Sequence, residues 1–111
     1  MKNHYLYKGR VIRTSEHDYS HACVRNGIKN PADLIVVSCN KNKELAESAK
    51  RREAKEINEA INEYKKELEA RAEGKTKIWW LKDETIEHIK SQIEKLENSL
   101  NSLKVVEIQK M

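Results

Sequence analysis

The sequence predicts an α+β fold, in which a small N-terminal antiparallel β-meander precedes a long antiparallel helical hairpin and a C-terminal strand. Two observations carry this prediction. Apolar residues alternate with a period of about two up to residue 42, and from Lys43 the period becomes about 3.6. One proline and three glycines in 111 residues leave no stretch suited to a linker. We therefore expect a single domain over 1–111, with the meander over 1–42, the helical hairpin over 43–103 and the last strand over 104–111.

The first predicted element is a β-hairpin over 3–15, which turns at Lys8 and Gly9. Glycine supplies the positive φ that tight turns of twisted hairpins require. The alternation of side chains then sets two pairs opposite one another: Tyr7 with Arg10, and Tyr5 with Ile12.

Two further strands are expected before the helices. Residues 19–25 favour a strand, and the turn-rich stretch 26–31 separates them from 33–39. This last run, Asp33 to Cys39, is the richest in β-branched residues. We expect it to be the central or best-buried strand of the sheet.

Two helices are predicted from apolar periodicity. The first runs from Lys43 to Glu73 and stops at Gly74, and its seam has a spacing of four, three and four residues. The second follows a loop or short strand over 75–81 and begins after a cap at Asp83 or Thr85. Its stripe resembles a coiled-coil seam, so we expect the two helices to pack as an antiparallel pair. The seam residues are Ile57, Ile61, Tyr64 and Leu68 in the first helix, and Ile86, Ile89, Ile93, Leu96, Leu100 and Leu103 in the second.

Composition limits the classes of protein. A net charge of +4 arises from 22 basic and 18 acidic residues, so the surface carries both signs, and the basic excess lies before residue 42. No apolar run reaches the roughly 20 residues of a membrane span, so we expect no membrane location, although this leaves contact with a membrane surface open. The two cysteines form no disulfide framework of the secreted type, and no basic-then-apolar leader opens the chain. We expect a cytoplasmic protein.

A metal site could be drawn from four residues if they met in space: His17, His21, Cys23 and Cys39. Their spacing fits no standard zinc pattern, and buried cysteines are common core residues, so we expect no metal and no cofactor. Catalytic motifs are also missing from the sequence. Helix carboxylates such as Glu63 and Glu67 have the spacing of a solvated surface. The sequence therefore favours a protein that is not an enzyme.

Binding residues are easier to nominate than catalytic ones. Tyr5, Tyr7, Arg10, Arg13, Tyr19 and Arg25 would place aromatic rings and positive charge on a small sheet, as in proteins that bind RNA or single-stranded DNA. Adjacent Trp79 and Trp80, near three lysines, could form a contact platform. We expect one of the two tryptophans in the core and the other at a contact. The candidate ligand- or partner-binding residues are Tyr7, Arg10, Arg13, Trp79 and Trp80.

One resemblance bears on function. The run from Tyr7 to Ser15, followed by Tyr19 to Ala22, resembles the opening of small bacteriophage proteins, with tyrosine, glycine, arginine, Thr-Ser, tyrosine and alanine in order. Chain length and the richness in lysine and asparagine are similar to phage-encoded inhibitors of bacterial defence, including anti-Thoeris sponges that sequester a cyclic ADP-ribose signal. Such a kinship implies an anion pocket at a dimer seam, lined by arginine and an aromatic residue.

The resulting hypothesis is a non-enzymatic, homo-oligomeric binding protein, plausibly a phage anti-defence inhibitor. It would occupy a host protein or sequester an anionic nucleotide signal. The alternative is a binder of RNA or single-stranded DNA that uses the N-terminal sheet.

Overall fold

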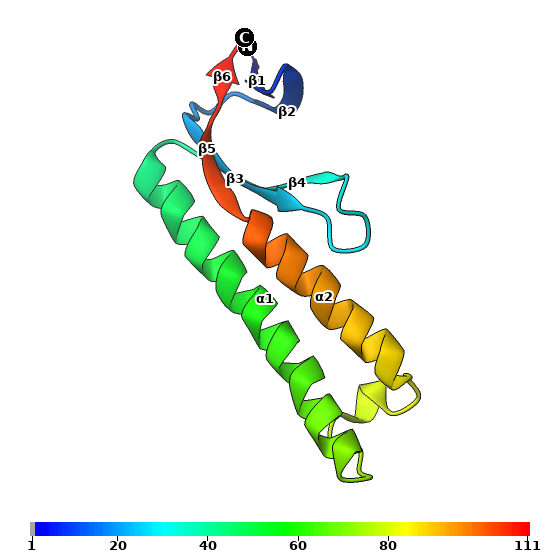
Figure 1. The fold of residues 1–111 in the computed structure, drawn as a ribbon. Coiled ribbons are helices and arrows are strands. Elements are labelled where there is room, and N and C mark those ends of the chain that lie inside the picture. The colour runs from blue at the N-terminus through cyan, green and yellow to red at the C-terminus, as the bar shows by residue number, and fades with distance from the viewer. Residues whose placement is uncertain (1) are drawn as a thin grey trace.

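The computed structural model describes residues 2–111 and confirms the α+β prediction (Figure 1). Two antiparallel sheets of three strands each are followed along the long axis by a pair of helices. The strands are β1 (Asn3–Tyr7), β2 (Arg10–Ser15), β3 (His21–Asn26), β4 (Leu34–Asn40), β5 (Lys104–Glu107) and β6 (Gln109–Lys110). The helices are α1 (Lys43–Ala72), the short 3₁₀ helix η1 (Trp79–Leu81) and α2 (Ile86–Ser102).

The first two strands form the predicted hairpin, with one change of register. Lys8 and Gly9 both have positive φ, +52° and +73°, as a tight turn between twisted strands requires. Tyr7 pairs with Arg10, as predicted. A β-bulge then shifts the ladder, so that Tyr5 pairs with Arg13 and the expected pairing with Ile12 is wrong.

The C-terminal segment completes both sheets. β5 pairs with β3, so that the inner sheet has the order β4-β3-β5, and β6 pairs with β1, so that the outer sheet has the order β2-β1-β6. β3 is thus the central strand of the inner sheet, and three of its residues are fully buried: Ala22, Cys23 and Val24. The prediction for residues 33–39 is wrong, because β4 lies at the edge and all its residues are only half-buried.

Side chains from the two sheets pack together in one apolar cluster. Tyr5, Ala22, Val24 and Ile108 form the buried centre between them. The Tyr5 hydroxyl donates to the His17 carbonyl oxygen (2.6 Å) and accepts from the Tyr19 amide (3.1 Å). This satisfied phenol fixes the loop between β2 and β3. The other face of the inner sheet packs against the helices through Cys23, Ala49 and Leu103.

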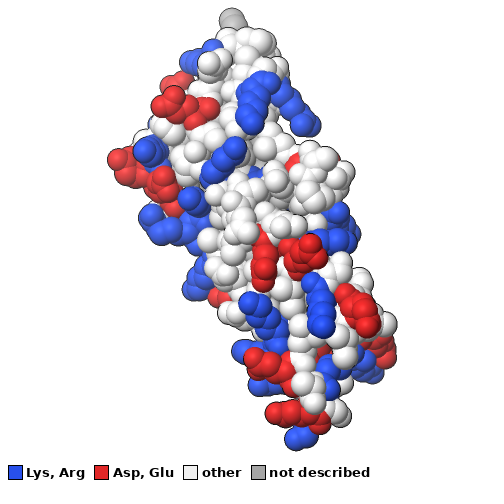
Figure 2. Space-filling view, viewed as in Figure 1, with Lys and Arg blue, Asp and Glu red and all other residues white. Residues whose placement is uncertain are grey.

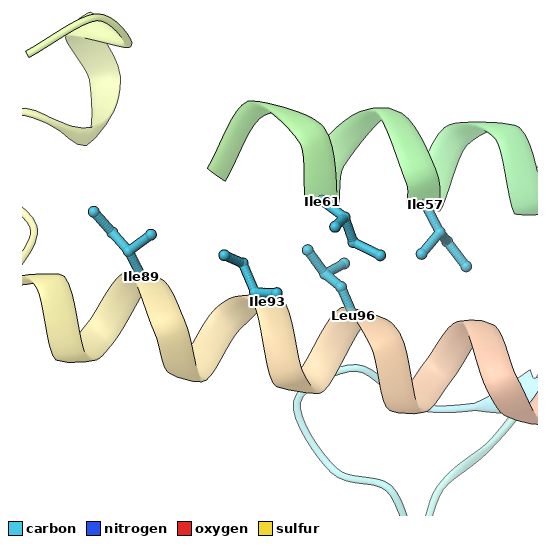
Figure 3. Packing of buried hydrophobic residues seen from close by; sticks show 5 residues of the cluster. All are labelled: Ile57, Ile61, Ile89, Ile93 and Leu96. Atoms are coloured by element: carbon cyan, nitrogen blue, oxygen red, sulfur yellow. The ribbon is translucent and has the colours of Figure 1, made fainter. Parts of the chain in front are cut away.

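The helical hairpin forms as predicted. Asn42 caps α1 by accepting the Leu45 amide, and Thr85 caps α2 by accepting the His88 amide. The facing sides of the helices bury the apolar seam shown in Figure 3, which consists of Ile57, Ile61, Ile89, Ile93 and Leu96. Of the residues predicted for the second seam, only Ile86 is exposed. Aliphatic burial along this seam holds the hairpin together.

Candidate ligand-binding cavity

A cavity of about 510 Å³ lies where the β1–β2 turn, the inner sheet and the last turn of α2 meet. This volume is in the usual range for small-molecule sites. Eleven residues line it, and we call it the cationic cavity: Tyr7, Lys8, Arg10, Val24, Arg25, Asn26, Leu34, Asn101, Ser102, Leu103 and Lys104.

Charge distinguishes this cavity from the rest of the surface. Its lining includes Lys8, Arg10, Arg25 and Lys104, and no Asp or Glu is among the described residues that line it. Elsewhere the signs are mixed, as Figure 2 shows along the helical part, where red and blue side chains alternate. Neighbouring cations without a carboxylate create a positive potential that favours an anion.

A hydrogen-bond network fixes the wall formed by β3 and α2. Arg25 Nη1 donates to Ser99 Oγ and to the Asn26 carbonyl oxygen, both at 3.2 Å, while its Nε lies 3.3 Å from Glu53 Oε1. The Asn26 amide donates to Ser102 Oγ (2.8 Å), and that hydroxyl donates to the Ser99 carbonyl oxygen (2.7 Å). Arg25 is therefore partly neutralised and held in place, which leaves Lys8, Arg10 and Lys104 as the cations without an ion pair among the described residues.

The β1–β2 turn forms the opposite wall. Lys8 Nζ lies 5.4 Å from the centroid of the Tyr7 ring, within cation–π range. The half-buried Tyr7 ring and the side chain of Leu34 add apolar surface beside these charges. The arrangement combines anion-attracting groups with an apolar wall.

The predicted binding residues fall into three places. Tyr7 and Arg10 line the cationic cavity. Arg13 lies elsewhere, with its guanidinium 5.8 Å from the Tyr19 ring. Trp79 and Trp80 are the first two residues of η1, at the far end of the helical hairpin (Figure 1).

The prediction of one core tryptophan is wrong. Trp79 is 78% exposed and Trp80 is 46% exposed, whereas Leu81 is buried at 2%. The buried residue of this segment is thus the leucine, and Trp80 contacts Tyr64 edge-to-face, with ring centroids 5.6 Å apart. Both indoles are therefore available to solvent.

A buried ion pair holds this end of the hairpin. Glu67 is fully buried, although its spacing predicts a solvated carboxylate. Its Oε1 accepts the Lys77 and Ile78 amides (2.9 and 3.0 Å), and its Oε2 accepts Arg71 Nε (2.7 Å). The Ile78 amide lowers the pKa of Glu67 most, and the Lys77 amide and Arg71 add to this against the opposing effect of burial.

Residues considered for a metal site do not converge. Cys23 faces α1, whereas Cys39 packs in the layer between the sheets. Burial raises the pKa of both thiols, which are free. His21 Nδ1 lies 2.7 Å from Ser20 Oγ. Within residues 2–111, no three His, Cys, Asp or Glu side chains form a group that could hold a metal ion.

Sequence reasoning missed most of the cavity, since only Tyr7 and Arg10 of its eleven lining residues were predicted to bind a ligand or partner. Asn101 and Ser102 in the last turn of α2 and Lys104 in β5 carry no motif, and the return of the C-terminal segment to the inner sheet places them in the cavity lining. The excess of N-terminal basic residues was the available signal, and it identified one wall alone.

Within the described residues, no helix combines the length and the apolar character that a bilayer crossing needs.

Comparison with protein-family models, with curated proteins and with solved structures found no match to this chain.

Proposed function

We propose that this chain is a non-enzymatic binding protein that holds a small anionic ligand of the nucleotide class in the cationic cavity. The supporting observation is the lining itself, in which four cationic side chains and no carboxylate surround about 510 Å³ of space. Charge-assisted hydrogen bonds to phosphate are among the strongest that a protein makes. A phosphate group is the anion best matched to several converging cations.

The rest of the lining favours a nucleotide over a bare phosphate. Tyr7 and Leu34 offer apolar surface to a base. The side-chain amides of Asn26 and Asn101 can form hydrogen bonds with base edges or with sugar hydroxyls. Lys8, Arg10 and Lys104 would hold the phosphate, since none of them has an ion-pair partner among residues 2–111.

The lining offers no nucleophile paired with a base and no pair of carboxylates. It contains none of the His, Cys, Asp or Glu side chains of the described chain. It carries two hydroxyls, on Tyr7 and Ser102, and the Ser102 hydroxyl already accepts the Asn26 amide and donates to the Ser99 carbonyl oxygen. Binding without turnover is what such a lining supports.

The biological role that we propose is sequestration of a nucleotide signal in the cytoplasm, as expected for a phage anti-defence inhibitor. The free thiols Cys23 and Cys39 suit a reducing compartment. The alternative, in which the N-terminal sheet stacks RNA or single-stranded DNA, has less support. Tyr5 is fully buried between the sheets, so its ring has no face to offer a base.

Titration calorimetry with adenosine diphosphate tests the proposal. Arg10→Gln removes a cavity cation, and Arg13→Gln removes the same charge from the same strand outside the cavity. Losing a charged hydrogen bond costs about 1.5–3 kcal/mol, so we expect Arg10→Gln to raise the Kd about 10- to 100-fold. Arg13→Gln should leave it within about twofold.

Two results would contradict the cavity as the site: equal effects of both arginine variants, or no saturable heat at low ionic strength. Stronger binding of a short oligonucleotide than of the mononucleotide, with equal sensitivity to both variants, would favour the nucleic-acid alternative.

A homo-oligomer is the second part of the proposal. The outer edge of β4 is uncharged over seven residues and pairs on one side only within the described chain. Edges of this kind can pair with an identical edge. A monomer in sedimentation velocity across the micromolar range would contradict the homo-oligomer, but it would not bear on ligand binding in the cavity.

A further inference from the structure

We infer that the tip of the helical hairpin, residues 75–86, is a docking surface for the interface of a phospholipid bilayer. This inference is independent of the proposed function, because the tip ends at the first residue of α2, whereas the cationic cavity is lined by the last turn of that helix, and the two share no residue (Figure 1). It concerns a surface that rests on the membrane, not one that crosses it.

The tip gathers most of the exposed apolar surface of the helices. Trp79 is 78% exposed, Trp80 46% and Ile86 41%. Single exposed apolar residues are ordinary, but two adjacent exposed tryptophans place an unusual amount of apolar surface at one site. Indole prefers the membrane–water interface, since its apolar ring and its N–H group are both satisfied there.

The tip is held in one conformation. Glu67 fixes the Lys77 and Ile78 amides, and Arg71 donates to the carbonyl oxygens of Leu81 and Glu84. These bonds join the crossover to the last turns of α1. The tryptophans are therefore presented outward by a fixed support, so little conformational freedom remains to be lost on docking.

Charge at the tip complements lipid phosphate. The segment 75–82 carries Lys75, Lys77 and Lys82 and no acid, and all three lysines are exposed. Asp83 and Glu84, which also belong to the tip, offset two of these three charges, so the tip keeps an excess of one positive charge, carried by the segment that holds the indoles. Lysines beside an anionic surface attract it, and their long side chains let the indoles enter the interface.

Shape favours a bilayer over a peptide or a ligand. The protein measures 59 × 25 × 21 Å, and the tip forms one end of its long axis (Figure 1). Lys75, Thr76 and Lys77 of the tip line a cavity of about 370 Å³ together with residues of both charges near the end of α1, but neither tryptophan lines it. The exposed indoles lie outside this cavity, as contact with a flat, deformable partner requires.

Intrinsic fluorescence tests this inference, because the only two tryptophans of the chain are both at the tip. The probe is a vesicle of phosphatidylcholine mixed with phosphatidylglycerol. We expect a blue shift of the emission and quenching by brominated acyl chains, both reduced by added salt. An unchanged spectrum at low ionic strength would overturn the inference, as would a blue shift caused by an oligonucleotide but not by vesicles.

Variants separate the tip from general charge attraction. Flotation with Trp79→Ala should show vesicle affinity lowered by about tenfold or more, because most of this indole is exposed before docking. A triple Lys→Gln variant at Lys75, Lys77 and Lys82 should also bind weakly, whereas the same change at exposed Lys2, Lys29 and Lys55 should not alter binding.

Equal loss in the two triple variants would refute a role for the tip. Arg10→Gln should bind vesicles normally, so failure of nucleotide binding and failure of lipid binding can be told apart.

Discussion

Replacing Ile89 by alanine should test the packing of the helical hairpin, because this side chain is fully buried between α1 and α2. The change removes about three methylene-sized groups, each worth about 0.8 kcal/mol of transfer free energy. The cavity left behind adds about 24 cal/mol per Å³, and the better helix propensity of alanine returns a few tenths of a kcal/mol. We expect the free energy of unfolding to fall by about 3 kcal/mol.

Ile86 provides a matched control one turn earlier in the same helix. It is the same residue type but is 41% exposed, so Ile86→Ala should cost about 1 kcal/mol or less. Urea unfolding followed by far-UV circular dichroism measures both variants. In a thermal melt, Ile89→Ala should lower the Tm by more than about 10 °C.

Two outcomes would refute this reasoning. If Ile89→Ala costs no more than Ile86→Ala, the seam does not hold the hairpin together. If tryptophan fluorescence and circular dichroism give different midpoints, the tip unfolds separately from the helices, and a single free energy does not describe the protein.

Three other predictions follow from buried or crowded groups. The pKa of Glu67 is lowered in the folded state, so its contribution to stability is present above its ordinary pKa of 4.5 and is lost as the pH falls through the lower, folded value. Urea unfolding at a series of acidic pH values should show this loss, and Glu67→Gln should reduce the dependence. Cys23 is fully buried and Cys39 only half-buried, so a thiol reagent should modify Cys39 first; equal rates would contradict the burial. Gly27→Ala should cost about 1–3 kcal/mol, because a Cβ there would lie 2.5 Å from the Asn30 carbonyl oxygen, and an unchanged midpoint in urea would show that the loop adapts.

The helical half of the fold could be predicted because its determinants are local. Periodicity placed α1 within a residue of its observed end, and Thr85 is one of the two caps proposed for α2. The spacing of Ile89, Ile93 and Leu96 identified the buried seam directly.

The arrangement of the sheets depends on contacts between residues that are distant in the sequence, so the β-propensity of a segment did not predict which strand is central. Residues 33–39 are the most strand-like, yet β3 is central because β5 returns from the C-terminus to its free side. Tertiary pairing decides which strand is buried, whereas β-propensity reflects only local preference.

The candidate site could be predicted only in part, because it too depends on contacts between residues distant in the sequence. Tyr7 and Arg10 were nominated from their chemistry, whereas Lys104 joins them only through the pairing of β5 with β3. Glu67 is a further case, since helix spacing predicts a surface carboxylate and only the crossover over 75–81 buries it.

Nuclear magnetic resonance mapping of amide shifts during titration with adenosine diphosphate tests the central claim most directly. We predict saturable shifts confined to three segments that line the cationic cavity: residues 7–10, 24–26 and 101–104. The amides near Trp79 should not move. Saturable shifts centred on another surface, or no shifts at low ionic strength, would contradict the claim that this cavity binds a nucleotide.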